Sequence, residues 1–63
     1  MYILTDEPDE PGPLKTAFDV LDDTFGTEEF SREKAIAALD TIDLRYSSDT
    51  FDRMVRLGYI SKA

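Results

Sequence analysis

The chain has 63 residues, of which 14 are Asp or Glu and 7 are Lys or Arg, so its formal net charge is −7, and it contains no Cys, His or Trp. A chain this short buries only about 60% of its unfolded surface, so we expect one domain, 1–63, stabilised by packing without disulfides. The missing Cys and His exclude zinc and iron–sulfur sites, thiol nucleophiles and Ser-His-Asp triads. No apolar run approaches the roughly 20 residues of a membrane span, and the start lacks the pattern of a signal peptide. We therefore expect a cytoplasmic protein without a membrane partner.

The acidic residues are unevenly distributed. Residues 1–30 hold nine acids and one base, a sum of −8, whereas residues 31–63 hold five acids and six bases, a sum of +1. This Asp-rich, Lys-poor composition resembles that of small proteins from salt-loving archaea, whose cytosol screens self-repulsion. The composition therefore predicts a halophilic protein.

The first half of the chain predicts a strand, a linker and a helix. Residues 1–5 are a short β-prone run. Residues 6–13 contain three prolines in six positions, which predicts a stiff, extended, acidic linker. Pro13 suits the first position of a helix with Gly12 as its cap, and Gly26 suits its end. Between them, apolar residues recur at the helical spacing of one continuous stripe: Leu14, Ala17, Phe18, Leu21 and Phe25.

A second helix is predicted from about 32 to 39. Ser31 is a natural N-cap, and Phe30 before it suits a hydrophobic staple with Ala35 or a strand of one or two residues. The helix would turn Ala35, Ile36 and Leu39 inward. Residues 40–46 fit two patterns, because Ile42, Leu44 and Tyr46 alternate like a strand but could also continue the helix. We interpret this stretch as a structured turn whose apolar residues fill the core.

Ser47 or Ser48 is expected to cap a third helix, which Gly58 ends. This helix would place Phe51, Met54 and Val55 against the core, with Leu57 as a further candidate. Residues 59–61 read as a final strand that could pair with residues 2–4, since neither run is stable alone. The expected fold class is α+β, mainly α: three helices and a minimal two-stranded sheet formed by the chain termini.

Residues 14–61 resemble the winged helix-turn-helix family. Residues 30–39 resemble its second helix, and the step Leu57-Gly58-Tyr59-Ile60 resembles the close of its third helix and the start of its wing. The chain stops before a returning strand, so the N-terminal run would have to supply the second strand, and the turn before the third helix exceeds the usual 3–4 residues. The resemblance implies a small non-enzymatic transcription regulator, lacking a full wing, that binds DNA through its third helix. The basic residues that could contact DNA are Arg32, Lys34, Arg45, Arg53 and Arg56.

The charge pattern of the third helix bears on whether that helix can bind DNA. DNA readers neutralise phosphates with Lys and Arg. Asp49 precedes Arg53 by four residues, and Asp52 precedes Arg56 by four, so both arginines are expected to form local pairs on a solvated face. Paired arginines argue against contact with phosphate. At high salt, however, counterion release adds little to DNA affinity, so a DNA-binding protein of a halophile need not be basic.

No catalytic or cofactor site is predicted. Asp19, Asp22 and Asp23 share the exposed side of the first helix, which is typical of a solvated acidic face. An EF-hand from Asp22 fails because Gly26 and Thr27 occupy its fifth and sixth positions. The chain has no Gly-rich phosphate loop and no nucleophile with a base. We expect no enzyme activity, no cofactor, no metal and no small-molecule substrate.

An acidic protein-interaction module, of adaptor or DNA-mimic type, is the alternative function. Its −8 half would engage a basic partner. Its terminal sheet would place Tyr2, Tyr59 and Ile60 along an exposed edge able to bind a partner strand or a second copy. The same three side chains could instead simply cap the core.

Overall fold

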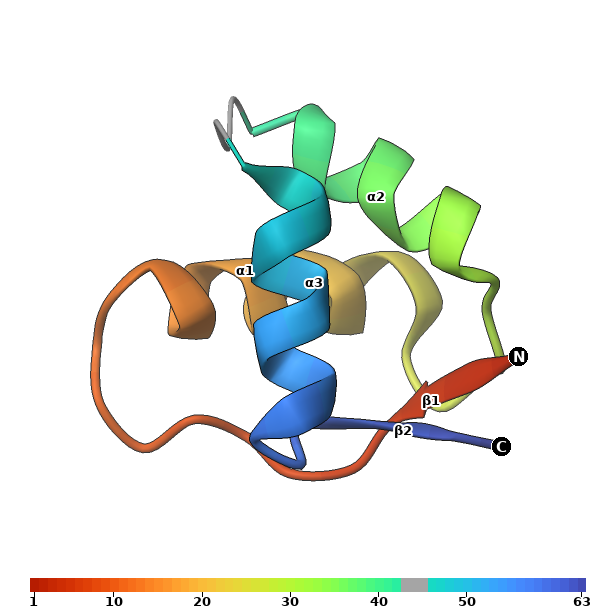
Figure 1. The fold of residues 1–63 in the computed structure, drawn as a ribbon, viewed down its shortest axis with the longest axis horizontal. Helices are drawn as coiled ribbons and strands as arrows, with labels where there is room; N and C mark the ends of the chain where they lie inside the picture. Colours follow the sequence, from red (N-terminus) through yellow and green to blue (C-terminus); the bar gives the residue numbers. More distant parts are fainter. Residues whose placement is uncertain (43–45) are drawn as a thin grey trace.

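The computed structural model describes residues 1–42 and 46–63. Its elements in chain order are β1 (Tyr2–Leu4), α1 (Pro13–Phe25), α2 (Arg32–Asp40), α3 (Ser47–Arg56) and β2 (Ile60–Lys62). The strands form one antiparallel sheet, in which Tyr2 lies opposite Lys62 and Leu4 opposite Ile60. Figure 1 shows this sheet at the open side of the three helices, with the N- and C-termini next to each other. The expected α+β fold, mainly helical with a sheet made by the chain termini, is confirmed.

The helix α1 follows its apolar stripe. Ala17, Phe18 and Leu21 are buried, and Pro13 occupies the first turn, where its missing N–H costs nothing. The helix ends at Gly26, whose φ of 60° is the left-handed conformation that glycine adopts without strain. The N–H of Gly26 donates to the carbonyl of Asp22 at 2.8 Å, which satisfies one of the last helical carbonyls.

The helix α2 begins at the predicted cap. The Ser31 hydroxyl accepts a hydrogen bond from the Lys34 N–H at 3.2 Å. Ala35 and Leu39 are fully buried. Phe30 forms the expected one-residue strand, because its N–H and carbonyl both bond to Tyr2 of β1, at 2.9 and 2.8 Å. Its ring stacks on Phe25 with centroids 4.7 Å apart, so the connection between α1 and α2 is held to both helix and sheet.

The start of α3 differs from the prediction. Tyr46 occupies the N-cap position and makes no side-chain capping bond, so the expected cap by Ser47 or Ser48 is wrong. The Ser47 hydroxyl hydrogen-bonds the Asp40 carboxylate instead, which joins the start of α3 to the end of α2. Phe51 is buried as expected.

The end of α3 and the preceding turn hold two further corrections. Leu57 is 54% exposed, so its packing against the core is wrong, because the helix stops at Arg56 and the chain turns away at Gly58. Tyr46 is 65% exposed and does not fill the core, whereas Ile42 is half-buried in a turn. The predictions that involve Leu44 and Arg45 lie outside the described residues.

The core lies between the three helices and the sheet. Phe30, at the bridge to β1, and Ile60, from β2, close it on the sheet side. The buried hydrophobic residues are Ala17, Phe18, Leu21, Phe30, Ala35, Leu39, Phe51, Met54 and Ile60. Since α3 packs through Phe51 and Met54, its opposite face is left to the solvent.

Candidate functional site

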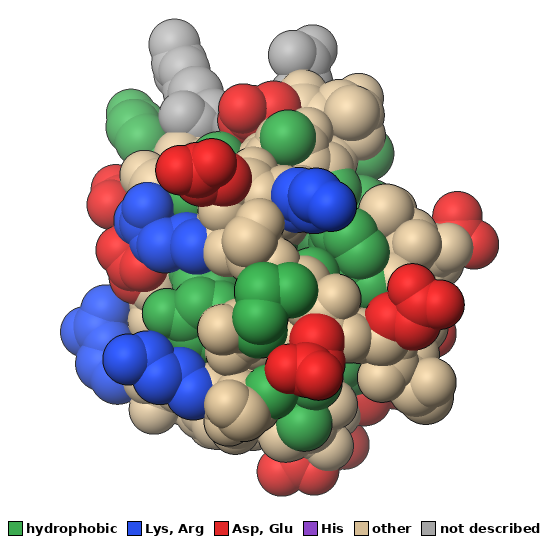
Figure 2. Space-filling model, turned by 90° about the vertical axis from the view of Figure 1, so that its right-hand side faces the viewer, with side chains coloured by type: hydrophobic (Ala, Val, Ile, Leu, Met, Phe, Trp, Pro, Cys, Tyr) green, Lys and Arg blue, Asp and Glu red, His purple; other side chains and the backbone are tan. Residues whose placement is uncertain are grey.

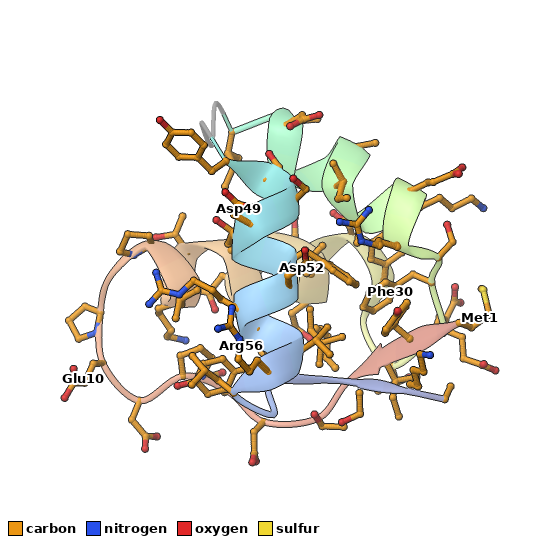
Figure 3. The ribbon with its side chains drawn as sticks, viewed as in Figure 1. Met1, Glu10, Phe30, Asp49, Asp52 and Arg56 are labelled. Carbon is orange, nitrogen blue, oxygen red and sulfur yellow. The ribbon has the colours of Figure 1, made fainter. Side chains whose placement is uncertain are left out.

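The outward face of α3 carries the predicted DNA-contacting arginines. Asp49, Asp52, Arg53 and Arg56 are all exposed, with the arginines in the last turn. Figure 3 shows Asp49, Asp52 and Arg56 at successive levels along this helix. Along α3 the two acidic residues therefore come first, and the two basic residues follow them.

The expected pairing along α3 does not occur. Asp52 pairs with Arg32 at the start of α2, with the Arg32 Nη2 3.4 Å from the Asp52 Oδ2. The Arg32 guanidinium also lies 5.8 Å from the centre of the Phe51 ring, which favours this position. Among residues 1–42 and 46–63, neither Arg53 nor Arg56 forms an ion pair, so the prediction that both arginines are already paired is wrong.

Two other predicted residues have different outcomes. Lys34 is exposed on the first turn of α2, and its backbone N–H completes the Ser31 cap. Arg45 falls outside the described residues.

On the face shown in Figure 2, Lys and Arg side chains gather mainly along the left edge, with acidic side chains above and beside them. The structure thus brings Arg32 to α3, whereas within residues 1–42 and 46–63 Arg53 and Arg56 form no ion pair. Their position in the last helical turn also suits the negative end of the helix dipole.

The residues predicted for the sheet edge do not form one exposed patch. Ile60 is 1% exposed and belongs to the core, so it is not available to a partner. Tyr2 lies opposite Lys62 rather than near Tyr59, and its ring makes an edge-to-face contact with Phe51 at 5.1 Å. Tyr59 precedes β2 and is half-buried. The alternative in which these side chains cap the core describes Tyr2 and Ile60.

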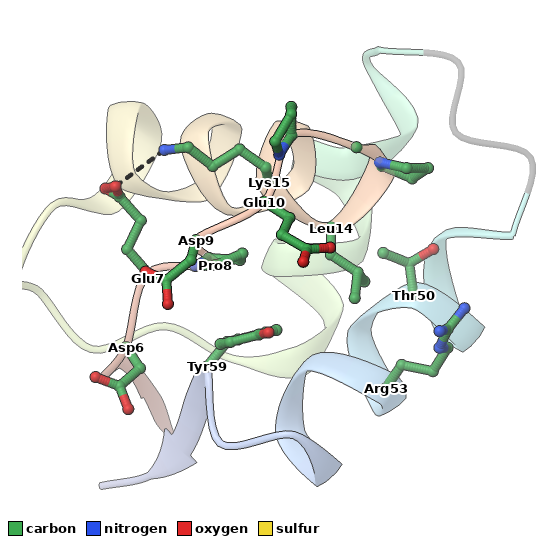
Figure 4. A pocket seen from close by; sticks show the side chains of 13 residues that line it. Asp6, Glu7, Pro8, Asp9, Glu10, Leu14, Lys15, Thr50, Arg53 and Tyr59 are labelled. Carbon is green, nitrogen blue, oxygen red and sulfur yellow. Dashed lines mark ion pairs between the residues drawn. The ribbon is translucent and has the colours of Figure 1, made fainter.

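A groove that the sequence did not predict lies beneath the acidic linker. It has a volume of about 610 Å³ and lies between the linker, the start of α1, and the last two elements of the chain. Thr50 and Arg53 of α3 line one side, Tyr59 and Leu14 line the middle, and residues 6–13 form the opposite rim (Figure 4). We call residues 6–13 the strap.

The strap is attached to the body at several points. The N–H groups of Thr5 and Asp6 donate to the Tyr59 carbonyl at 2.9 and 3.4 Å. The Lys15 Nζ lies 3.0 Å from both the Glu7 Oε2 and the Asp19 Oδ1. The hydrogen bond to Glu7, followed by the one to Asp19, raises the pKa of Lys15 above its ordinary value of 10.5. These contacts attach the start of the strap to the body, and Pro8, which follows Glu7, is buried.

Neither a metal cluster nor a membrane helix is present in the part of the chain that the structure describes. No group of three or more acidic side chains there is placed to hold a metal ion. None of the described helices has both the length and the apolar content required to cross a bilayer.

Comparisons with family models, curated proteins and solved structures gave no match for this chain. The α3 face and the strap groove are the two surfaces of the molecule that suggest a function.

Proposed function

We propose that the protein is a small winged-helix-like regulatory domain that binds DNA through α3. The strand arrangement supports this proposal. β1 pairs with two segments: with Phe30, which stands just before α2, and with β2, which follows α3. The N-terminal strand thereby supplies the second strand that the family resemblance requires. The Asp-rich composition supports a halophilic, cytoplasmic setting for the domain.

The observation that carries the proposal is the unpaired state of two arginines. Arg53 and Arg56 are exposed on the outward face of α3 and have no carboxylate within ion-pair distance among the described residues. A guanidinium can donate two parallel hydrogen bonds to a phosphate. Asp49 lies near the other end of the same face and repels phosphate. The two arginines in its last turn make the C-terminal end of α3 the proposed point of contact with DNA.

The net charge affects how this binding depends on salt. A body of charge −7 repels DNA at long range, but the Debye length falls from about 8 Å at 0.15 M salt to about 3 Å at 1 M. Screening therefore weakens the repulsion more than it weakens a direct contact between guanidinium and phosphate. A test must separate the local contact from the overall charge.

A pair of variants with equal net charge provides this separation. Arg53→Gln with Arg56→Gln, and Thr16→Glu with Thr27→Glu, each lower the charge from −7 by two units, to −9. Thr16 and Thr27 are exposed and lie on or next to α1 rather than on α3. The assay is fluorescence anisotropy with a mixed-sequence DNA duplex from dilute buffer to molar KCl, with far-UV circular dichroism to follow folding at each salt concentration.

We expect the two arginines to account for about 2 phosphate contacts. The plot of log K against log salt concentration should therefore be less steep for the arginine variant, by about 1.8. The threonine variant should keep the wild-type slope. Equal slopes in all three proteins, or no retention of DNA by folded wild-type protein at any salt, would contradict the proposal. Unfolding of the wild type in dilute buffer would support the halophilic setting.

A further inference from the structure

We propose that the strap groove binds a basic segment of a protein partner, with a Lys or Arg side chain of that segment held between Tyr59 and the strap carboxylates. The strap and Leu14 belong to the −8 half of the chain, whereas Thr50, Arg53 and Tyr59 line the groove from the other half, so this site shares Arg53 with the DNA contact proposed for α3. The groove is attached to the body by the strap's own contacts, so the ligand would enter a preformed space.

The charges at the rim identify the sign of the ligand. Four acidic residues of the strap, in two pairs on either side of Pro8, line the groove, and in the described part of the chain only Glu7 among them is in an ion pair. Asp6, Asp9 and Glu10 are exposed and have no cationic partner there. Three uncompensated carboxylates on one short segment attract a cation and repel phosphate. This charge complementarity favours a basic protein segment and opposes nucleic acid at this surface.

The middle of the groove supplies a suitable contact for the stem of a basic side chain. Figure 4 shows Tyr59 between the strap and α3, with Asp9 and Glu10 on the strap side. The Tyr59 ring offers a face for a cation, and Leu14 offers an apolar surface for the methylene groups of Lys or Arg. An aromatic ring next to unpaired carboxylates is a better match for a basic side chain than for a bare metal ion.

The other end of the groove sets the direction in which the ligand lies. Arg53 lines that end together with Thr50, and its positive charge excludes a second cation there. The basic side chain is therefore held at the strap end, and a carbonyl or carboxylate of the same segment lies toward Arg53. The strap spans eight residues, or up to about 26 Å when extended, so it can follow a peptide chain rather than a single side chain.

The probe is the peptide acetyl-(Lys-Ala)3-amide, with acetyl-(Glu-Ala)3-amide as its charge-reversed counterpart. Both are titrated into the intact ¹⁵N-labelled protein while amide chemical shifts are followed. The test variant is Asp9→Asn with Glu10→Gln. Its matched control is Asp22→Asn with Asp23→Asn, which removes the same two charges from the last turn of α1. All four positions are exposed, so neither variant disturbs the core.

We expect the lysine peptide to shift the amides of the strap, Thr50 and Tyr59. The strap variant should bind about tenfold more weakly, as for the loss of two exposed charge contacts, and the control should stay within about twofold of wild type. Three results would overturn the proposal: no binding of the lysine peptide, equal weakening in both variants, or equal binding of the glutamate peptide. Groove shifts that depend on protein concentration alone would instead assign the groove to a second copy of this chain.

Discussion

The Ser31 cap makes a prediction that distinguishes this structure from a simple sequence pattern. The Ser31 hydroxyl accepts the Lys34 N–H at 3.2 Å, whereas α3 has no side-chain capping bond although two serines stand at its start. Ser31→Ala should therefore cost about 1 kcal/mol of unfolding free energy. Ser48→Ala should cost nothing and gain up to about 0.5 kcal/mol, because alanine is the better helix former in the first turn.

The size of this loss is large relative to the stability of such a small domain. At about 0.05–0.15 kcal/mol per residue, 63 residues give a total of roughly 3–9 kcal/mol. With a urea m-value of about 1 kcal/mol/M, Ser31→Ala should lower the urea midpoint by about 1 M. The corresponding decrease in Tm is about 4–8 °C.

Urea titrations followed by circular dichroism at 222 nm measure both variants against wild type in the same buffer. The reasoning is refuted if Ser48→Ala lowers the midpoint as much as Ser31→Ala does, because α3 would then be capped by that serine. It is also refuted if Ser31→Ala leaves the midpoint unchanged.

Three further predictions concern the core, the dipole of α1 and the strap. Leu39→Ala, at a fully buried position, should cost about 2–5 kcal/mol, more than Ser31→Ala, as measured by the urea midpoint; a loss below about 1 kcal/mol would contradict the burial. Asp23→Lys should stabilise by about 0.3–1 kcal/mol in the same urea assay, because α1 has no basic residue in its last turn; a loss would contradict this. Lys15→Met should release the strap and lower stability at neutral pH. Since the folded-state pKa of Lys15 lies above the unfolded value of 10.5, the difference from wild type should stay constant from neutral pH up to about pH 10.5 and vanish as pH rises through the folded-state pKa. A difference that persists at still higher pH would show that the ion pairs of Lys15 are not its cause.

The features that the sequence predicted well depend on neighbours in the chain. The stripe from Leu14 to Phe25, the ending at Gly26 and the cap at Ser31 follow from backbone geometry within one or two turns. The pairing of the terminal runs was also predicted, because neither short β-prone segment is stable as a strand alone.

The features that were missed depend on where distant segments meet. Asp52 had Arg56 one turn away, but Arg32 approaches it from 20 positions earlier, which a local spacing rule cannot detect. The Ser47 hydroxyl was drawn to Asp40 by the way α2 meets α3. The groove depends on Lys15 holding Glu7, and the nearest sequence signal was a single basic residue after an acidic linker.

The pairing of β1 with β2 affects how the protein can fold during its synthesis. β1 is synthesised before its partner strand, residues 60–62, so Leu4 cannot pair with Ile60 until β2 has emerged from the ribosome. Ile60 is also the last buried core residue in chain order. The nascent chain therefore exposes the apolar stripe of α1 until almost all of the domain has emerged, and folding then closes a loop of more than 50 residues in one late step. Its acidic first half, already emerged by then, keeps such chains apart by mutual repulsion.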